Sequence, residues 1–161
     1  MLKFLDLPAH PLFVHAPIVL LPLLTIVSLV LVVRSDWRVK AWLPFTVGIV
    51  ALFVSLILAM ESGEALDDAF RGLAPTKRHI QFAETTRLLV FALVVVTVAE
   101  AVLVRRRSRS TAVSTTAPND KLVLLERLGS FVVLLIGVLA TIWMIRTGHE
   151  GAKAVWSQTK L

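Results

Sequence analysis

Four long apolar runs dominate this sequence and most constrain its fold. They cover about residues 11–33, 41–60, 84–104 and 124–146 of a chain of 161 residues. An α-helix rises 1.5 Å per residue, so about 20 residues cross the hydrocarbon core of a bilayer. Only helices and closed barrels satisfy their backbone polar groups in that core. We therefore predict an all-α integral membrane four-helix bundle that forms one domain over residues 1–161.

The overall composition agrees with a membrane protein and excludes several other classes. Hydrophobic residues make up 57% of the chain, which is high for a soluble domain of this size. The net charge of +6 could suggest nucleic acid. Basic residues beside membrane spans instead set orientation and meet lipid head groups, so we expect lipid contact and no nucleic-acid partner. Cysteine is absent, so the chain alone forms no disulfide and ligates no iron–sulfur cluster.

An even number of spans fixes which segments share a side of the membrane. Four spans place the N-terminus, the connection between the second and third spans, and the C-terminus on one side. The arginine cluster at 105–109 directly follows the third span on the other side. Cytoplasmic loops are enriched in Lys and Arg, so we predict that the termini face the exterior or periplasm.

Prolines and polar stretches predict where the helices bend and end. Pro17 and Pro22 lie inside the first run, where each removes a backbone donor and should kink the helix. Residues 34–40 are polar, and we expect a short loop there. The stretch from Arg105 to Pro118 is rich in Arg, Ser and Thr, which indicates a flexible basic loop.

All four histidines of the chain fall on the side that carries the termini. His10 and His15 open the first run, His79 precedes the third, and His149 follows the fourth. Neutral imidazole is the commonest metal ligand and also binds haem, and helix bundles build cofactor sites from facing helices.

Several uses of these imidazoles stay open at this point. Two haems would use all four histidines and one haem would use two; copper or zinc would use three, or two with a carboxylate. Alternatively, the histidines lie at the membrane interface only because imidazole is amphipathic.

Two carboxylates near the histidines are further candidates. Glu61 and Glu64 are spaced i, i+3 after the second run, and they share a face if that helix continues. They are possible metal ligands or hydrogen-bond partners of an imidazole, and a solvated acidic turn is the alternative. Glu84 lies five residues after His79 and diverges from it, so we expect Glu84 to pair with Arg87.

Glu100 lies inside the apolar core of the third run, which extends from Leu88 to Val104. A carboxylate there is costly and is usually paired or functional. Arg127 lies at a similar distance from the same end of the fourth run. We predict a structural ion pair between Glu100 and Arg127 rather than a proton relay, because no ladder of acidic groups crosses the spans.

Three motifs together resemble a known family. They are His-Pro-x-x-Val-His-x-Pro at 10–17, the central His79, and Thr-Gly-His-x-Gly-Ala at 147–152. This combination resembles a bacterial family of small four-helix integral membrane proteins of unknown function, which occur alone or fused or adjacent to Rieske iron–sulfur domains. The resemblance implies a redox or cofactor-binding context in the bacterial inner membrane.

With this resemblance, the leading expectation is an electron-transfer protein that binds haem b on its outer side. The resemblance implies that the haem ligands are among His10, His15, His79 and His149. A Rieske protein or a respiratory complex is the implied redox partner. Two alternatives remain, namely a cofactor-free accessory subunit of a respiratory or photosynthetic complex, and a copper- or zinc-binding membrane protein. No nucleophile–base pair is visible, which favours a carrier or subunit over a stand-alone enzyme, and a homo-oligomer is possible.

Overall fold

A computed structural model describes residues 3–4, 7–69, 77–113 and 120–156. The chain begins with a short antiparallel pair, β1 (Lys3–Phe4) and β2 (Leu7–Pro8). The helices that follow are α1 (Ala9–Phe13), α2 (His15–Val33), α3 (Ser35–Ala69), α4 (Lys77–Val113) and α5 (Asp120–Trp156). The predicted all-α four-helix architecture is confirmed, and α2 to α5 each contain one of the four apolar runs.

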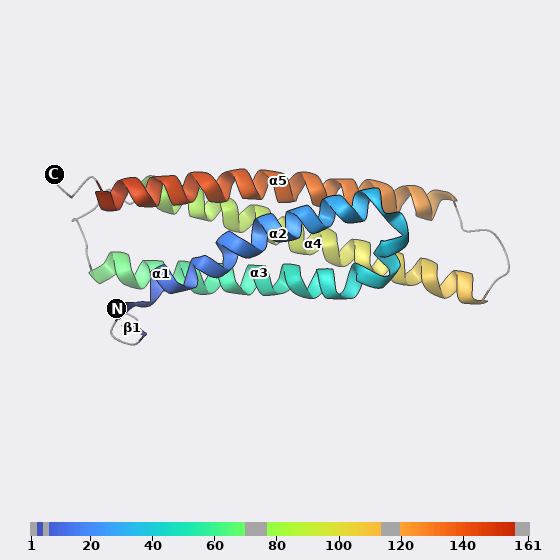
Figure 1. The fold of residues 1–161 in the computed structure, drawn as a ribbon, viewed down its shortest axis with the longest axis horizontal. Coiled ribbons are helices and arrows are strands. Elements are labelled where there is room, and N and C mark those ends of the chain that lie inside the picture. The colour runs from blue at the N-terminus through green and yellow to red at the C-terminus, as the bar shows by residue number, and fades with distance from the viewer. Residues whose placement is uncertain (1–2, 5–6, 70–76, 114–119, 157–161) are drawn as a thin grey trace.

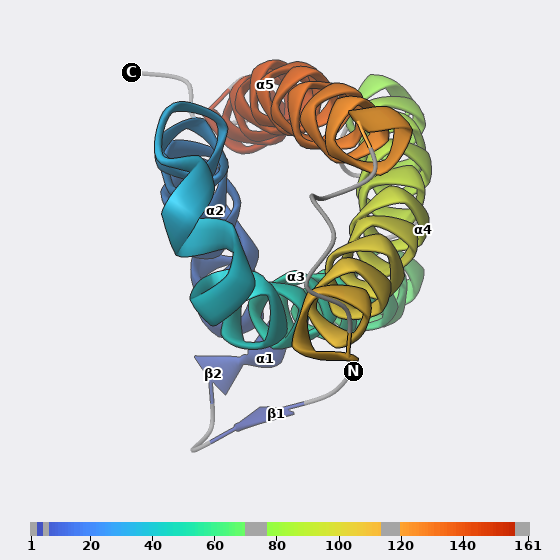
Figure 2. The ribbon, with the colours of Figure 1, turned by 90° about the vertical axis from the view of Figure 1, so that its right-hand side faces the viewer.

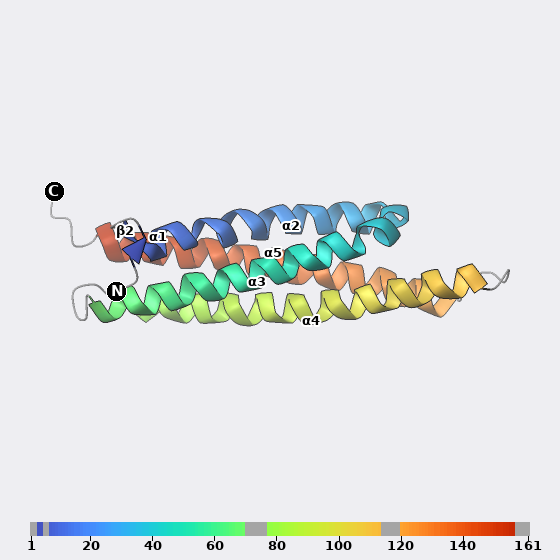
Figure 3. The same cartoon turned by 90° about the horizontal axis from the view of Figure 1, so that it is seen from below.

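The four long helices surround one common axis (Figure 2). Each of them packs against its two neighbours in the circular order α2, α3, α4, α5, so α2 and α4 lie diagonally across the bundle. The strands β1 and β2, the end of α3, the start of α4 and the end of α5 lie at one end of the bundle (Figure 1). At the other end α4 and α5 extend beyond the turn that joins α2 to α3 (Figures 1 and 3).

The distribution of apolar side chains suits a bilayer. Four helical segments are long and apolar enough to cross a membrane: His10–Val33, Ser35–Asp68, Lys77–Arg109 and Asp120–Ala154. Large apolar residues such as Val19, Phe91 and Ile145 are exposed on the outside of the bundle. The interior is closed by a continuous apolar core, which comprises Leu21, Leu31, Phe45, Ile49, Leu52, Leu56, Val90, Leu93, Val133 and Ala140.

The first apolar segment is interrupted at Val14, as Pro17 predicts, whereas α2 continues through Pro22 without a break. Pro17 has no N–H, so the carbonyl of Phe13 loses its usual partner. Helical bonds resume on either side, from Val14 N to the His10 oxygen and from Ile18 N to the Val14 oxygen. The break separates α1 from α2, and α1 packs against α3.

Two expected loops are shorter than the sequence indicates. Only Arg34 interrupts the helix between α2 and α3, so the expected loop at 34–40 is wrong beyond that residue. The basic stretch that starts at Arg105 is helical up to Val113. Arginine is a good helix former, and Arg107 pairs with Glu126 on α5 at 2.8 Å, which holds this extension of α4 against its neighbour.

Candidate functional site

His10 is held against α3 by its ring nitrogen and by a glycine. Its Nδ1 lies 2.8 Å from the carbonyl oxygen of Ala59 and 3.3 Å from the buried hydroxyl of Ser62. A Cβ atom added at Gly63 would lie 2.9 Å from Cε1 of the His10 ring, which is closer than such atoms approach. The absence of a side chain at Gly63 therefore makes room for this imidazole.

His79 is held against α5 in the same way. Its Nδ1 lies 2.9 Å from the carbonyl oxygen of Thr147, and a Cβ atom at Gly151 would lie 2.9 Å from that nitrogen. The hydroxyl of Thr147 lies 3.2 Å from that of Thr86, which ties α5 to α4 at this level. Both imidazoles thus have a backbone carbonyl at Nδ1 and a glycine beside the ring.

The two imidazoles meet although they belong to opposite sides of the bundle. Their ring centroids are 6.4 Å apart and the ring planes are inclined by 85°. His10 precedes α2 and His79 lies in the first turn of α4, and α2 and α4 are diagonal (Figure 2). The pair therefore spans the interior of the bundle at the end that carries the chain termini.

The hydrogen bonds determine which ring nitrogen is free. A carbonyl oxygen only accepts, so Nδ1 of His10 and of His79 carries the hydrogen, and the neutral ring then has its lone pair on Nε2. An imidazole bound to a metal commonly donates its other N–H to a carbonyl or carboxylate in this way. In both neutral rings the lone pair therefore lies on Nε2.

The other two histidines are placed differently. The rings of His15 and His149 are both exposed, and Nδ1 of His15 lies 2.5 Å from the Pro11 oxygen of its own helix. All four histidines lie at one end of the bundle, as expected from the number of spans. Of these four imidazoles, the structure brings His10 and His79 together in the interior.

The acidic candidates do not join this pair. Helix α3 continues to Ala69, so Glu61 and Glu64 are helical, and both side chains are exposed. Within the described ranges no group of three or more His, Asp or Glu side chains is placed to hold a metal ion. Glu84 pairs with Arg87 at 2.5 Å, which confirms the prediction for that pair.

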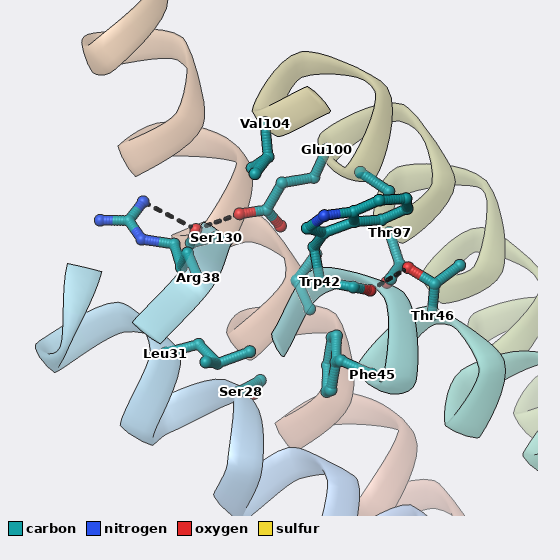
Figure 4. A pocket seen from close by; sticks show the side chains of 12 residues that line it. Ser28, Leu31, Arg38, Trp42, Phe45, Thr46, Thr97, Glu100, Val104 and Ser130 are labelled. Atoms are coloured by element: carbon teal, nitrogen blue, oxygen red, sulfur yellow. Dashed lines mark hydrogen bonds between the residues drawn. The ribbon is translucent and has the colours of Figure 1, made fainter. Parts of the chain in front are cut away.

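A second polar cluster lies at the opposite end of the bundle (Figure 4). The carboxylate of Glu100 on α4 accepts a hydrogen bond from Ser130 on α5. Arg38 on α3 donates from Nη1 to the Ser130 hydroxyl at 3.1 Å and to the Glu126 carbonyl at 3.2 Å. Glu126 is 1% exposed and pairs with Arg107. The cluster connects three helices.

This arrangement corrects the predicted ion pair between Glu100 and Arg127. Arg127 is exposed, whereas Glu126 and Ser130 face the interior four residues apart on one side of α5. Rotation of α5 about its axis therefore presents Ser130 to Glu100 and turns Arg127 outward. Sequence reasoning missed Arg38 and Ser130. The available signal was the i, i+4, i+7 spacing of Glu126, Ser130 and Val133, which defines one buried face.

A comparison with protein families identifies the chain. The model of a family described as predicted membrane proteins, DUF2231, matches residues 6–159. The chain belongs to this family. It is thus a predicted membrane protein, and four of its helices are long and apolar enough to cross a bilayer. Neither the curated proteins nor the solved structures contain a match to it.

Proposed function

We propose that this DUF2231 protein is a membrane electron carrier that binds one haem through His10 and His79. The observation that carries the proposal is the 6.4 Å separation of the two ring centroids. His10 and His79 would hold the metal through Nε2, since two rings this close can both reach one metal at a distance of about 2.0–2.1 Å. The fixed tautomers leave both Nε2 atoms available for this role.

The number of ligands favours haem over a bare ion. Structural zinc takes four protein ligands and catalytic zinc takes three, and in the described ranges two imidazoles converge. A porphyrin would supply the other nitrogen ligands of its iron, so His10 and His79 would be enough to hold it. A copper or zinc ion held by the same two imidazoles is the second candidate, and it would need further ligands from solvent.

In the proposed function, the protein orients the two imidazoles and shields the bound cofactor. Gly63 and Gly151 let the imidazoles approach the neighbouring helices, and carbonyls at Nδ1 hold both rings. Bound haem would supply an iron that gains and loses one electron. We place the site at the outer face of a bacterial inner membrane because the arginine cluster at 105–109, toward the end of α4, favours the cytoplasm. A Rieske protein or a respiratory complex, as the family resemblance implies, would exchange the electron.

The deciding experiment is an absorption spectrum of the purified protein, oxidised and then reduced, with metal analysis of the same sample. Expression is carried out with ample haem. A Soret band, sharp reduced bands and one haem per chain by pyridine haemochrome are expected. Stoichiometric copper or zinc with no Soret band would show that the site binds a metal ion instead of haem. A flat spectrum without metal would refute both and leave the cofactor-free accessory subunit.

A further inference from the structure

An open groove lies between α2 and α5 at the end of the bundle opposite the histidines. Its walls come from the last residues of α2, from the start of α3 and from α5. The groove is lined by Val32, Val33, Ser35, Arg38, Arg127, Leu128, Ser130 and Phe131. Two arginines from different helices therefore share one opening with apolar side chains.

The polar part of the groove suits an anion. Arg127 is exposed and projects from α5, while Arg38 is only 6% exposed. Arg38 uses Nη1 for its bonds to α5, and its buried Nε has no hydrogen-bond partner in the described part of the chain. Figure 4 shows the Arg38 guanidinium directed away from the Glu100 carboxylate, with Ser130 between them. No carboxylate is among the described residues that line the groove.

The apolar part of the groove opens toward the lipid. Val33, Leu128 and Phe131 are 72%, 55% and 58% exposed, so they cover an outer surface of the bundle rather than its core. Trp37, also exposed, lies one residue before Arg38 in the first turn of α3, and tryptophan is typical of the head-group level of a bilayer. A ligand here would meet arginines at that level and apolar side chains beside them.

We propose that this groove binds one anionic phospholipid, whose phosphate lies between Arg38 and Arg127 and whose acyl chain follows Leu128 and Phe131. Arginine forms bidentate hydrogen bonds with phosphate, and basic pockets between membrane helices hold anionic lipids. The proposal does not depend on a cofactor at the histidines, which lie at the other end of the bundle. A lipid bound there would join α2 to α5 where α2 ends.

The test compares lipid stabilisation of delipidated protein in detergent micelles. The thermal unfolding temperature is measured with phosphatidylglycerol, with phosphatidylcholine and with inorganic phosphate, for the wild type, Arg127→Gln and Arg109→Gln. Arg109 is a matched control, because it is an exposed arginine at the same end, on α4 and outside the groove. Arg38 is left intact since its bonds to α5 support the fold.

We expect phosphatidylglycerol to raise the unfolding temperature of the wild type and of Arg109→Gln, and phosphatidylcholine to have little effect. The apparent affinity of Arg127→Gln for phosphatidylglycerol should fall about fivefold, as expected for one arginine near an anionic surface. Equal responses of the two variants would overturn the proposal, since a general surface charge would then explain binding. Full stabilisation by inorganic phosphate would also overturn it, in favour of a simple anion site.

Discussion

The rings of His10 and His79 lie 6.4 Å apart, and each is held at Nδ1 by a carbonyl of a further helix. Four helical elements therefore define the position of two imidazoles. The ring of His10 rests on α3 and that of His79 rests on α5. This arrangement separates the inward-facing pair from the exposed His15 and His149, and it makes the proposed site testable by matched variants.

Replacing either inward-facing histidine should empty the proposed site. In His10→Ala and His79→Ala, haem or metal content should fall to about a tenth of the wild-type value or less, because one of two ligands is removed. His15→Ala and His149→Ala should retain full content, since both rings are exposed. Content is measured by pyridine haemochrome and metal analysis on equal amounts of folded protein. Loss in all four variants, or in none, would contradict the two-histidine site.

The glycines beside the rings should act as positioning residues. An alanine at Gly151 would place its Cβ 2.9 Å from Nδ1 of His79, and one at Gly63 equally close to Cε1 of His10. We expect each substitution to weaken cofactor binding about tenfold, the range found when partners of a ligand are disturbed. The measurement is haem titration followed by the Soret band.

Gly148→Ala is the control for these two variants, because, among the described residues and apart from the adjoining helix backbone, no atom lies within 4 Å of the added Cβ. It should bind as the wild type does. A lower unfolding temperature of Gly151→Ala with unchanged haem affinity would show that Gly151 serves packing alone.

The polar cluster at the opposite end should contribute to stability through Ser130. Its hydroxyl donates to Glu100 and accepts from Arg38, so Ser130→Ala leaves the half-buried Glu100 carboxylate and the buried Arg38 guanidinium without that partner. The free energy of unfolding should fall by about 1–3 kcal/mol, the usual cost of an unsatisfied buried group. Circular dichroism during denaturation in detergent micelles provides the measurement.

Ser55→Ala is the matched control, since within the described part of the chain that hydroxyl bonds only to the Leu52 carbonyl of its own helix. It should change the free energy of unfolding by less than about 0.5 kcal/mol. If the two serine variants lost equal stability, the bridge that Ser130 forms between Glu100 and Arg38 would add nothing to the free energy of unfolding beyond an ordinary serine hydroxyl.

The contact between α2 and α5 should depend on Gly137. A Cβ there would lie 2.9 Å from the Thr25 hydroxyl, which is fixed by bonds to Leu21 and Thr141. Gly137→Ala should therefore destabilise the bundle by about 1–3 kcal/mol through overpacking. Gly129→Ala, whose Cβ would meet Glu100 at an ordinary 3.8 Å, should be neutral or slightly stabilising. Thermal unfolding of both variants tests this, and a stable Gly137→Ala would disprove the tight contact.

The sequence by itself determined the class of the protein, its four spans and the end at which the histidines gather. These features follow from local hydropathy and from the number of crossings, and neither requires knowledge of how helices face one another. The break near Val14 was also local, because it follows from the missing N–H of Pro17.

The tertiary structure alone decided which side chains meet. His10 and His149 share one end of the bundle, yet His10 turns inward and His149 is exposed. Likewise, the sequence favoured Arg127 as the partner of Glu100 because both lie at a similar depth in the membrane. In the structure Glu100 instead accepts a hydrogen bond from Ser130. The physical reason is that depth in the membrane follows from sequence position, whereas facing depends on the rotation of each helix about its axis. That rotation is set by packing between helices, including the close approaches at Gly63, Gly137 and Gly151.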